Sequence, residues 1–519
     1  MKVAIEKPVI LAILDGWGIR KDSSGNAVAL AETPNMDYLM SNYPNAKLTT
    51  YGEAVGLPPF QVGNSEVGHM NLGAGRTMMM DLPRIDKAVS EGFFERDRNF
   101  RSFVKTIKKA KGDIHLVGLC SEGGVHSHQN HILEAIKVLR NNDVRVFLHM
   151  ILDGRDTPPK NALETLREFQ KISGDLSFIV TITGRFYAMD RDRRWERTKL
   201  FFDSIISRQG KLFESPQDFI ESQYDLGLTD EFIKPSVSRT YKGIQIGKDA
   251  VIFMNFRADR IRQIATSLFD PEFKVFSLPR QPLFSMGASL VSYSDGLGKQ
   301  LRTFFPKAEI KNTLGRVVSH HGMKQLRIAE TEKYAHVTYF FNCGEEIPIE
   351  GEDRILVQSP RVSTYDLKPQ MSIKSVVDNL IKSIDSGQYT FIVVNFANPD
   401  MVGHTGKIEA AIKACESVDI AVGSMLEATK RKGGTILLVA DHGNCEEMID
   451  IEKQQPHTSH TLNPVPVILI SDQETTRIRD GTLADIAPTL LDLMDVAKPL
   501  EMTGGSLLKK KPSLYNIDL

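Results

Sequence analysis

Cysteine is scarce in this sequence, and the few cysteines are not paired by their spacing. Only four occur among 519 residues, at Cys120, Cys343, Cys415 and Cys445, and no two of them form a CxxC motif. Scattered cysteines of this kind are typical of reduced thiols in a cytosolic protein. The sequence therefore argues against a disulfide framework and predicts a protein of the cytoplasm.

The sequence also lacks an excess of charge of either sign. Lys and Arg number 64 against 65 Asp and Glu, which gives a net charge of -1. Binding to nucleic acid or to an anionic membrane is favoured by an overall basic field, which is absent here. We therefore expect neither nucleic acid nor a membrane among the partners of this protein.

No apolar stretch near the N-terminus is long enough for a signal segment or a membrane span. The apolar run covers Val9–Leu14, and Glu6, Lys7 and Asp15 flank it closely. Segments that enter or cross a bilayer need longer uninterrupted apolar runs. Internal repeats, low-complexity tracts and coiled-coil heptads do not stand out either, so nothing points to a fibrous or repeat architecture.

What is present is the composition of a globular protein, with 41% hydrophobic and 25% charged residues. The length exceeds one ordinary domain and favours two. Continuous apolar runs alternate with helical patterns, as in α/β domains with mostly parallel sheets. The predicted strands are 9–14, 113–119, 144–152, 178–183, 251–256, 391–396, 435–440 and 466–470, and helices are predicted from 34, from 130 and over 410–431, with a helix-like stretch at 336–341.

Ser65 lies in the stretch GNSEVGHMNLGAGR, residues 63–76. A Gly-Asn pair precedes it and Glu66 and Val67 follow, which predicts a serine at the first turn of a helix. Two interpretations remain open from this stretch alone. Ser65 caps the helix, the usual role of serine at such a place, or it is a nucleophile whose phosphorylated form the helix N-terminus stabilises.

Asp and His residues follow or precede four of the predicted strands. In an open α/β sheet, loops at the carboxyl ends of parallel strands meet at one edge. Singly, each residue is a common turn or capping residue, but together they offer the oxygen and nitrogen donors suited to Zn²⁺ or Mn²⁺. With Ser65 they suffice for a two-metal phosphoryl-transfer centre. The residues are Asp15, Asp400, His404, Asp441, His442 and His460.

Residues 99–300 predict a second α/β domain with a different chemistry at its strand ends. Four loops, at 121–128, 153–159, 184–191 and 257–260, carry His or Arg directly after predicted strands. A single arginine in such a loop is most often a surface charge. Four loops that agree predict an anion site, because Arg binds phosphate and carboxylate with two parallel hydrogen bonds.

Long motifs along nearly the whole chain resemble those of the cofactor-independent phosphoglycerate mutases, in the alkaline phosphatase superfamily. Cys343 departs from the pattern, since a second glycine is expected after Asn342. The motifs are DGWG at 15–18, GNSEVGHMNLGAGR at 63–76, SEGGVHSH at 121–128, DGRDTPP at 153–159, GRFYAMDRDRRWER at 184–197, NFRADR at 255–260, ETEKYAHVTYFFN at 330–342, NPDMVGHTG at 398–406, ADHGN at 440–444 and HTSHT at 457–461.

The resemblance implies an alkaline-phosphatase-like domain, residues 1–78 and 312–519, whose mostly parallel sheet is sandwiched by helices. A second α/β domain, residues 79–311, is inserted into it and binds the substrate. Closure of the two domains would use hinges at 77–82 and 306–312 and would exclude water. The resemblance also implies a cytoplasmic protein, expected to be a monomer, with phosphoglycerate as its substrate.

The resemblance further implies roles for individual residues. Ser65 would become phosphorylated, Lys333 would contact the transferring phosphoryl group, and Asp156 is a candidate acid/base. Two divalent ions are expected, most readily Mn²⁺, with Zn²⁺ or Co²⁺ as substitutes. Asp400, His404 and His460 would bind one ion, and Asp15, Ser65, Asp441 and His442 the other. The glycerate would be held by His126, Arg155, Asp156, Arg185, Arg191, Arg257 and Arg260.

The implied reaction is the interconversion of 3-phosphoglycerate and 2-phosphoglycerate through phosphoserine, without free 2,3-bisphosphoglycerate. Two alternatives remain at this point. One is another enzyme of the same superfamily, such as a phosphatase, phosphopentomutase or sulfatase, although the Arg-rich insertion argues against a simple phosphatase. The other is a non-catalytic phosphate- or metal-binding protein, which the full set of donors around Ser65 argues against.

Overall fold

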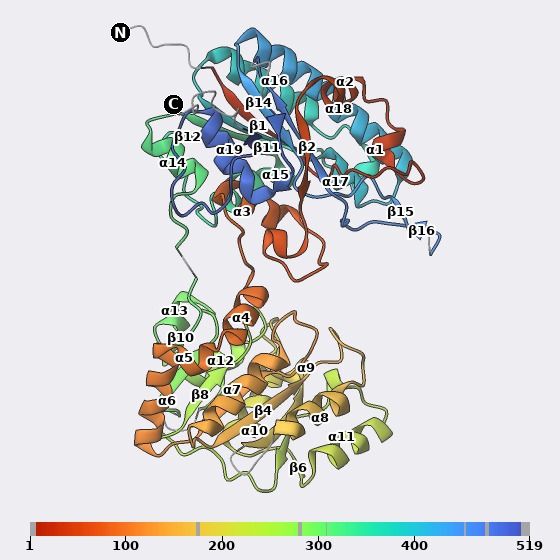
Figure 1. The fold of residues 1–519 in the computed structure, drawn as a ribbon. Coiled ribbons are helices and arrows are strands. Elements are labelled where there is room, and N and C mark those ends of the chain that lie inside the picture. The colour runs from red at the N-terminus through yellow and green to blue at the C-terminus, as the bar shows by residue number, and fades with distance from the viewer. Residues whose placement is uncertain are drawn as a thin grey trace, which may run out of the picture. The chain divides into compact units, whose positions relative to one another are not determined.

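The computed structural model describes residues 7–172, 177–278, 283–307, 309–450, 453–472 and 477–509. The chain divides into two compact units (Figure 1), one formed by Met1–Met80 with Glu309–Leu519 and the other by Asp81–Ala308. Each unit has its own apolar core around its own sheet. Among the described residues, no helix combines the length and the apolar character needed to cross a bilayer.

The sheet of the first unit has eight strands in the order β12-β11-β13-β1-β14-β17-β2-β19. The five strands β12, β11, β13, β1 and β14 are parallel to one another, whereas β17 is antiparallel to both β14 and β2. Their bounds are β1 Val9–Leu14, β2 Asn45–Thr49, β11 Gln325–Glu330, β12 Glu352–Val357, β13 Phe391–Phe396, β14 Thr435–Val439, β17 Val465–Ile470 and β19 Gly481–Thr482.

The middle of this sheet explains why distant parts of the sequence meet. Strands β1 and β13 are buried along their whole length, as the continuous apolar runs predict for parallel strands. Leu14 pairs with Phe396 and Ile13 with Val439, so β1, β13 and β14 end side by side. Because β17 runs the other way, its N-terminal end lies at this same edge. The segments that follow β1, β13 and β14 and the segment that precedes β17 are therefore neighbours.

The sheet of the second unit also has eight strands, in the order β10-β9-β8-β3-β4-β5-β7-β6. All neighbouring strands are parallel except β5 and β7. The four strands β8, β3, β4 and β5 are adjacent, so their carboxyl ends share one edge. The bounds are β3 Ile114–Leu119, β4 Val146–Leu152, β5 Ser177–Gly184, β6 Lys211–Phe213, β7 Ser236–Ser238, β8 Ala250–Phe253, β9 Met286–Ser289 and β10 Leu301–Thr303.

Strand β8 is shorter than the predicted strand 251–256. It ends at Phe253, and the Oδ1 atom of Asn255 accepts the backbone N–H of Leu119 at 3.0 Å. A side chain thus takes the place of a backbone ladder partner, and the chain leaves the sheet there. The predicted run was correct as a buried segment, but a polar residue inside it ended the strand early.

Helices pack against both sheets. The helix-like stretch predicted at 336–341 is a π-helix, His336–Phe340, which continues directly from α15. In the first unit the α-helices are α1 Ala27–Leu30, α2 Pro34–Asn42, α3 Ser65–Ala74, α14 Leu314–His320, α15 Thr331–Ala335, α16 Ile373–Ser386, α17 Asn398–Gly403, α18 Ile408–Arg431 and α19 Ile486–Leu493. In the second unit they are α4 Asp81–Ser90, α5 Phe93–Arg96, α6 Arg98–Ala110, α7 Gln129–Asn141, α8 Ala162–Ile172, α9 Arg185–Ala188, α10 Trp195–Ile206, α11 Pro216–Asp225, α12 Arg262–Phe269 and α13 Asp295–Gly298.

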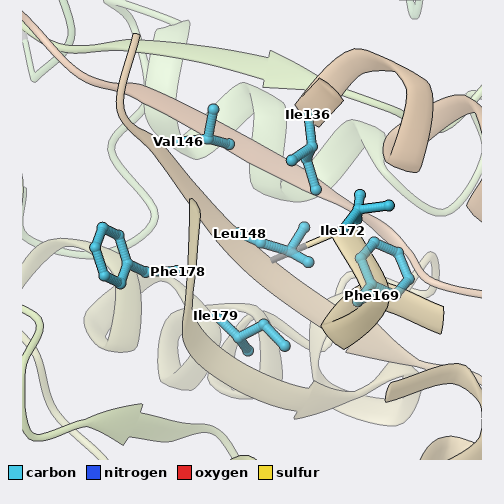
Figure 2. A pocket seen from close by; sticks show the side chains of 7 residues that line it. All are labelled: Ile136, Val146, Leu148, Phe169, Ile172, Phe178 and Ile179. Atoms are coloured by element: carbon cyan, nitrogen blue, oxygen red, sulfur yellow. The ribbon is translucent and has the colours of Figure 1, made fainter. Parts of the chain in front are cut away.

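A small apolar cavity lies in the second unit (Figure 2). Its volume is about 10 Å³, and its lining offers no polar side chain. Ligand pockets are far larger and contain a few placed polar groups. The cavity is therefore a packing gap between helices and sheet. It is lined by Ile136 of α7, Val146 and Leu148 of β4, Phe169 and Ile172 of α8, and Phe178 and Ile179 of β5.

Candidate functional site

Ser65 is the first residue of α3, but it does not cap the helix. Asn64 is the N-cap residue, and its Oδ1 atom accepts the N–H of Val67 at 2.9 Å. The capping interpretation of Ser65 is therefore wrong, because the neighbouring asparagine satisfies the helix end. The hydroxyl of Ser65 is instead directed into a buried polar centre at the edge of the sheet.

Three groups surround the Ser65 hydroxyl. Its Oγ atom lies 3.1 Å from Oδ1 of Asp15, 2.9 Å from Nε2 of His442 and 2.7 Å from Nζ of Lys333. Ser65 and these three partners are all buried. A serine between a carboxylate, an imidazole and an ammonium can lose its proton to a base and remain stabilised as an anion. This is the environment expected of a nucleophile.

Three buried carboxylates share a single ammonium group. The Nζ atom of Lys333 lies 2.7 Å from Oδ1 of Asp15 and 2.6 Å from Oδ2 of Asp400, and Asp441 is buried nearby. Burial opposes the charge of Lys333, but the three carboxylates together raise the pKa of this lysine. One positive charge cannot balance three buried negative charges, so the centre favours additional cations.

Burial alone would raise the pKa of Asp400. The Lys333 ammonium, followed by the neighbouring imidazoles of His404 and His460, outweighs this effect and holds the pKa well below its ordinary value. Burial also works against ionisation of Asp441, yet His442, His69 and Lys333 lower the pKa of that carboxyl. Both groups are thus carboxylates at neutral pH and are available as ligands.

The three histidines of the centre are oriented in the manner of metal ligands. His404 donates from Nδ1 to the carbonyl of Thr458 at 2.8 Å, and His460 donates from Nδ1 to the carbonyl of Gly63 at 2.7 Å. The Nδ1 atom of His442 lies 3.3 Å from the carbonyl of Gly443. A histidine that binds a metal through Nε2 usually makes such a bond with its other nitrogen.

The Nε2 atoms of these histidines converge on carboxylates. Those of His404 and His460 lie 3.1 Å apart, and they lie 3.2 Å and 3.1 Å from Oδ1 of Asp400. With Nδ1 protonated, each Nε2 presents a lone pair, and two facing lone pairs repel unless a cation lies with them. The residues present therefore fit divalent ions bound by oxygen and nitrogen.

The geometry gathers the donors into two groups that could each hold an ion. One consists of Asp400, His442 and His460, and the other of Asp15, Asp441 and His442, with the ligand atoms within 4.8 Å of one another. His442 belongs to both groups, which the sequence did not indicate. His404 is next to the first group, because it contacts Asp400 and His460. Ser65 is next to the second group, because it contacts Asp15 and His442.

Three further buried side chains contact the predicted donors. Asn395 donates to Asp15, Asn444 donates to Asp400, and His69 lies beside Asp441. The sequence analysis did not single them out. A signal was present for Asn395, the one polar residue in the apolar run 391–396, and for His69, which is one helical turn after Ser65.

A second polar cluster lies at the carboxyl edge of the sheet in the second unit. The Nη1 atom of Arg185 lies 2.6 Å from Oδ1 of Asp153 and 2.5 Å from Oδ2 of Asp156. Arg155 pairs with Glu231 at 3.6 Å. The structure thus brings Arg155, Asp156 and Arg185 together and adds two carboxylates that the sequence analysis did not name.

Asp259 is the centre of the other half of this cluster. Its carboxylate lies 3.4 Å from Nδ1 of His126, 3.0 Å from Nη1 of Arg191 and 3.3 Å from Nε of Arg257. Arg260 donates to the carbonyl of Met189 at 3.3 Å. The sequence placed all the cationic members here but missed Asp259, although it lies within the NFRADR motif.

The charged groups of this cluster shift one another's pKa values. Burial first, then Arg185 and Arg257, lower the pKa of His126 to about 4, with Asp259 acting in the opposite direction. His126 is therefore uncharged at neutral pH. Partial burial and the charges of Arg191, Arg185 and Arg155 also lower the pKa of Arg260. Several guanidinium groups at short range make this edge suited to an anion.

Cys343 follows the π-helix and has left-handed backbone geometry, with φ of 57°. Its Sγ atom lies 3.7 Å from the carbonyl of Met70 on α3, the helix that begins with Ser65. Left-handed geometry costs a residue with a Cβ atom roughly 1–2 kcal/mol, which explains why glycine is expected here. Cys343 thus packs against α3 in a strained backbone conformation.

Changing Cys343 to glycine should therefore raise the free energy of unfolding. We expect a gain of about 1 kcal/mol, because the strain relieved exceeds the extra entropy of a glycine in the unfolded chain. Urea denaturation followed by circular dichroism would measure it. Lys111→Gly is a matched control at the left-handed end of α6, φ 54°, and should also stabilise. A loss of stability in Cys343→Gly alone would mean that thiol packing outweighs strain.

Comparisons with known proteins match nearly the whole chain. A sequence model of the metalloenzyme superfamily matches residues 7–498. The 2,3-bisphosphoglycerate-independent phosphoglycerate mutase of Roseobacter denitrificans is 48% identical over 502 residues, 97% of this chain and 99% of that protein. The enzyme of the same name from Rhodopseudomonas palustris is 49% identical over 502 residues, again 97% and 99% of the two chains.

Solved structures include one that is similar along the whole chain. The phosphoglycerate mutase of Leishmania mexicana, described at low cobalt concentration, is 29% identical with a TM-score of 0.61, covering 98% of this chain and 99% of that one. The predicted fold class, two α/β domains with mostly parallel sheets of which the second is inserted into the first, is confirmed. Matched along almost its entire length by such enzymes, the chain belongs to the 2,3-bisphosphoglycerate-independent phosphoglycerate mutases within the metalloenzyme superfamily, as its motifs indicated.

Proposed function

We propose that this chain interconverts 3-phosphoglycerate and 2-phosphoglycerate by carrying the phosphoryl group on Ser65. The overall reaction is that of its family, a glycolytic isomerase that needs no free 2,3-bisphosphoglycerate. The observation that supports the route through Ser65 is the position of its hydroxyl. It lies at a helix N-terminus, within 3.1 Å of Asp15, His442 and Lys333.

The residues around Ser65 suggest how the phosphoryl group is received. Backbone N–H groups at the start of α3 favour an anion on the serine. The Lys333 ammonium, 2.7 Å from the Ser65 Oγ atom, is placed to donate a hydrogen bond to the transferring phosphoryl oxygens. We therefore assign Ser65 as the nucleophile and Lys333 as a catalytic group that stabilises charge developing on the phosphoryl group.

We assign two divalent ions to the donors of the first unit. Asp400, His404 and His460 would hold one, and Asp15, Ser65, Asp441 and His442 the other. Oxygen and imidazole donors without a thiolate suit Mn²⁺, with Zn²⁺ or Co²⁺ as substitutes. When bound, such ions lower the pKa of a coordinated hydroxyl and neutralise phosphoryl oxygens.

The second polar cluster, called the Arg cluster below, is suited to the glycerate part of the substrate. Its guanidinium groups can bind a carboxylate with paired hydrogen bonds. Asp156, held by Arg185, is a candidate to take a proton from the attacking glycerate hydroxyl and return it later. His126, beside Asp259, would orient the substrate. The full set is His126, Arg155, Asp156, Arg185, Arg191, Arg257 and Arg260.

The two units therefore receive different tasks. We assign residues 1–78 and 312–519 to phosphoryl chemistry and residues 79–311 to substrate binding, because Ser65 and the metal donors lie in the first and the Arg cluster in the second. We further propose a monomer that acts in the cytoplasm, where glycolysis takes place. The four cysteines are buried and none is in a disulfide, which agrees with a reducing compartment.

Arg257→Ala tests the task assigned to the second unit. Loss of a charge-assisted contact should raise KM for 3-phosphoglycerate roughly 10- to 150-fold, equivalent to about 1.5–3 kcal/mol. The metal content should not change, because the donors lie in the first unit. Steady-state kinetics and elemental analysis would measure the two effects.

Arg239→Ala is the matched control for this variant. Arg239 is also exposed and paired with a carboxylate, Glu214, but it follows β7, which is antiparallel to β5 and ends toward the opposite edge of the sheet. Its loss should leave KM unaltered. An unaltered KM in Arg257→Ala as well would remove Arg257 from the proposed substrate site.

A further inference from the structure

Two buried side chains that have no assigned role lie behind the serine and its carboxylate partner. His69 is on α3, one turn after Ser65, and Asn395 is in β13, next to β1. Both are fully buried, with 0% of their surface exposed. Polar groups this deeply buried cost stability unless their hydrogen bonds are made. Their partners therefore indicate what they hold in place.

The orientation of Asn395 follows from the chemistry of its neighbours. Its Nδ2 atom lies 2.7 Å from Oδ2 of Asp15 and 3.1 Å from Nε2 of His69. A carboxylate only accepts hydrogen bonds, so the amide must present nitrogen, not oxygen, to Asp15. Its second hydrogen then goes to His69. The Oδ1 atom of Asn395 accepts no hydrogen bond from the described residues.

This arrangement fixes the tautomer of His69. Because its Nε2 atom accepts from Asn395, the proton is on Nδ1, which lies 2.8 Å from the carbonyl oxygen of Ser65. The same Nδ1 atom lies 3.4 Å from Oδ2 of Asp441, an oxygen that accepts no hydrogen bond from the described residues. One imidazole thus contacts the backbone of the nucleophile and a second carboxylate.

We propose that Asn395 and His69 act together as positioning residues that hold Asp15, Asp441 and Ser65 as one ligand group. This inference rests on the metal centre proposed above. Asn395 fixes Oδ2 of Asp15, which leaves Oδ1 directed at Ser65 and His442. The hydrogen bonds run from Asp15 through Asn395 to His69 and on to the carbonyl of Ser65. Asp15 sets the orientation of the Asn395 amide, and this amide sets the tautomer of His69, so the two residues act as one unit.

The other group of metal donors, around Asp400, is held by a different residue. Within the described residues, neither Asn395 nor His69 forms a hydrogen bond or ion pair with Asp400, His404 or His460. Asp400 is held by another buried amide, Asn444, whose Nδ2 atom lies 2.9 Å from Oδ1 of Asp400. Each group of donors therefore has its own supporting asparagine, and the two can be tested against each other.

Calorimetric titration of the chelator-stripped full chain with Mn²⁺ tests the proposal. The unaltered protein should bind two ions. Asn395→Leu, which keeps the volume but removes the donor, should weaken one site 10- to 100-fold, the range typical when a residue supporting a metal ligand is lost. The second site should change less than about threefold, since its donors are held elsewhere. Asn444→Leu is the matched control and should weaken the other site instead.

Variants of His69 separate positioning from general packing. His69→Ala should reproduce the binding defect of Asn395→Leu, and the double variant should be no more than about threefold worse than either, because the two residues act as one unit. His69→Asn places an amide near the original Nδ1 position and should restore most of the affinity. Circular dichroism would confirm the fold of each variant, and His69→Ala serves if Asn395→Leu does not fold.

The outcomes are distinct. Two unaltered sites in Asn395→Leu or His69→Ala would overturn the positioning role. Equal weakening of both sites by Asn395→Leu and by Asn444→Leu would overturn it as well, since it would show only general damage to the fold. Fewer than two ions in the unaltered protein would instead overturn the proposed two-metal centre on which the inference rests.

Discussion

Replacing Ser65 with alanine should lower mutase activity by roughly 10⁴-fold or more, because the nucleophile that carries the phosphoryl group is lost. The fold should remain, since Ser65 is not the cap of α3 and its removal leaves the Asn64 bond to Val67 intact. We expect a change in the free energy of unfolding below about 1 kcal/mol, the usual cost of losing a cap. Coupled enzyme assay and urea denaturation would measure these quantities.

Asn64→Ala is the natural counterpart of this variant. It removes the actual cap and should destabilise the protein by about 1 kcal/mol. Because Ser65 retains its hydroxyl, activity should fall far less than in Ser65→Ala. If Ser65→Ala retained more activity than Asn64→Ala, the assignment of Ser65 as the phosphoryl carrier would be wrong.

The same assignment predicts the fate of isotopic labels. A mixture of unlabelled 3-phosphoglycerate and substrate labelled in both phosphate and carbon should give 2-phosphoglycerate in which the two labels remain together. Phosphoserine formation followed by return to the same glycerate requires this result. Exchange of phosphate between glycerate molecules would contradict the intramolecular route, even if the metal donors were assigned correctly.

The central strands of the first unit were predictable because their signal is local. Val9–Leu14 is a continuous apolar run and Phe391–Phe396 is apolar except for Asn395, and both strands are observed with those bounds. Buried parallel strands need apolar side chains on both faces, so composition alone reveals them. The strands Asn45–Thr49 and Gly481–Thr482, at one end of the sheet, were not predicted, because they are partly exposed and are defined by pairing with distant residues.

The candidate site was predictable only in part, for a related reason. Donors that directly follow strands were found because parallel topology brings such positions together. His460 was found in the same way only as a residue before a strand, and its place depends on the antiparallel direction of β17, which no local pattern gives. Asn395 was missed because a buried polar residue within a strand is revealed by its partners, and those partners are hundreds of residues away.

Adjacent polar residues also limit what a sequence can decide. Asn64 and Ser65 are both good caps, and the pattern alone did not show which one serves the helix. The structure shows that the asparagine does, through a bond to Val67. Because Asn64 caps the helix, the hydroxyl of Ser65 is available for chemistry. Only the backbone geometry shows which residue has which role.

Removal of bound metal should abolish activity and destabilise the first unit. Asp15, Asp400 and Asp441 are buried, with 0%, 2% and 0% of their surface exposed. Within the described chain, Lys333 is the one ammonium in contact with this group, through Asp15 and Asp400. Without divalent ions, most of this negative charge is left uncompensated, which opposes folding. An ion present at 100 times its Kd stabilises the folded protein by about 2.7 kcal/mol, so chelation should lower the thermal unfolding temperature.

The measurement combines activity, metal analysis and thermal unfolding of the same sample before and after exhaustive chelation. Mn²⁺ should restore both activity and unfolding temperature, and Zn²⁺ or Co²⁺ should restore them to different extents. Asp441→Asn is the matched control, because the loss of a ligand of one ion should leave one ion to remove instead of two and make the unfolding temperature less sensitive to chelator. Full activity in protein shown by metal analysis to be free of ions would contradict the two-metal centre. Loss of activity with no change in unfolding temperature would contradict a different point, namely that the ions compensate the buried carboxylates.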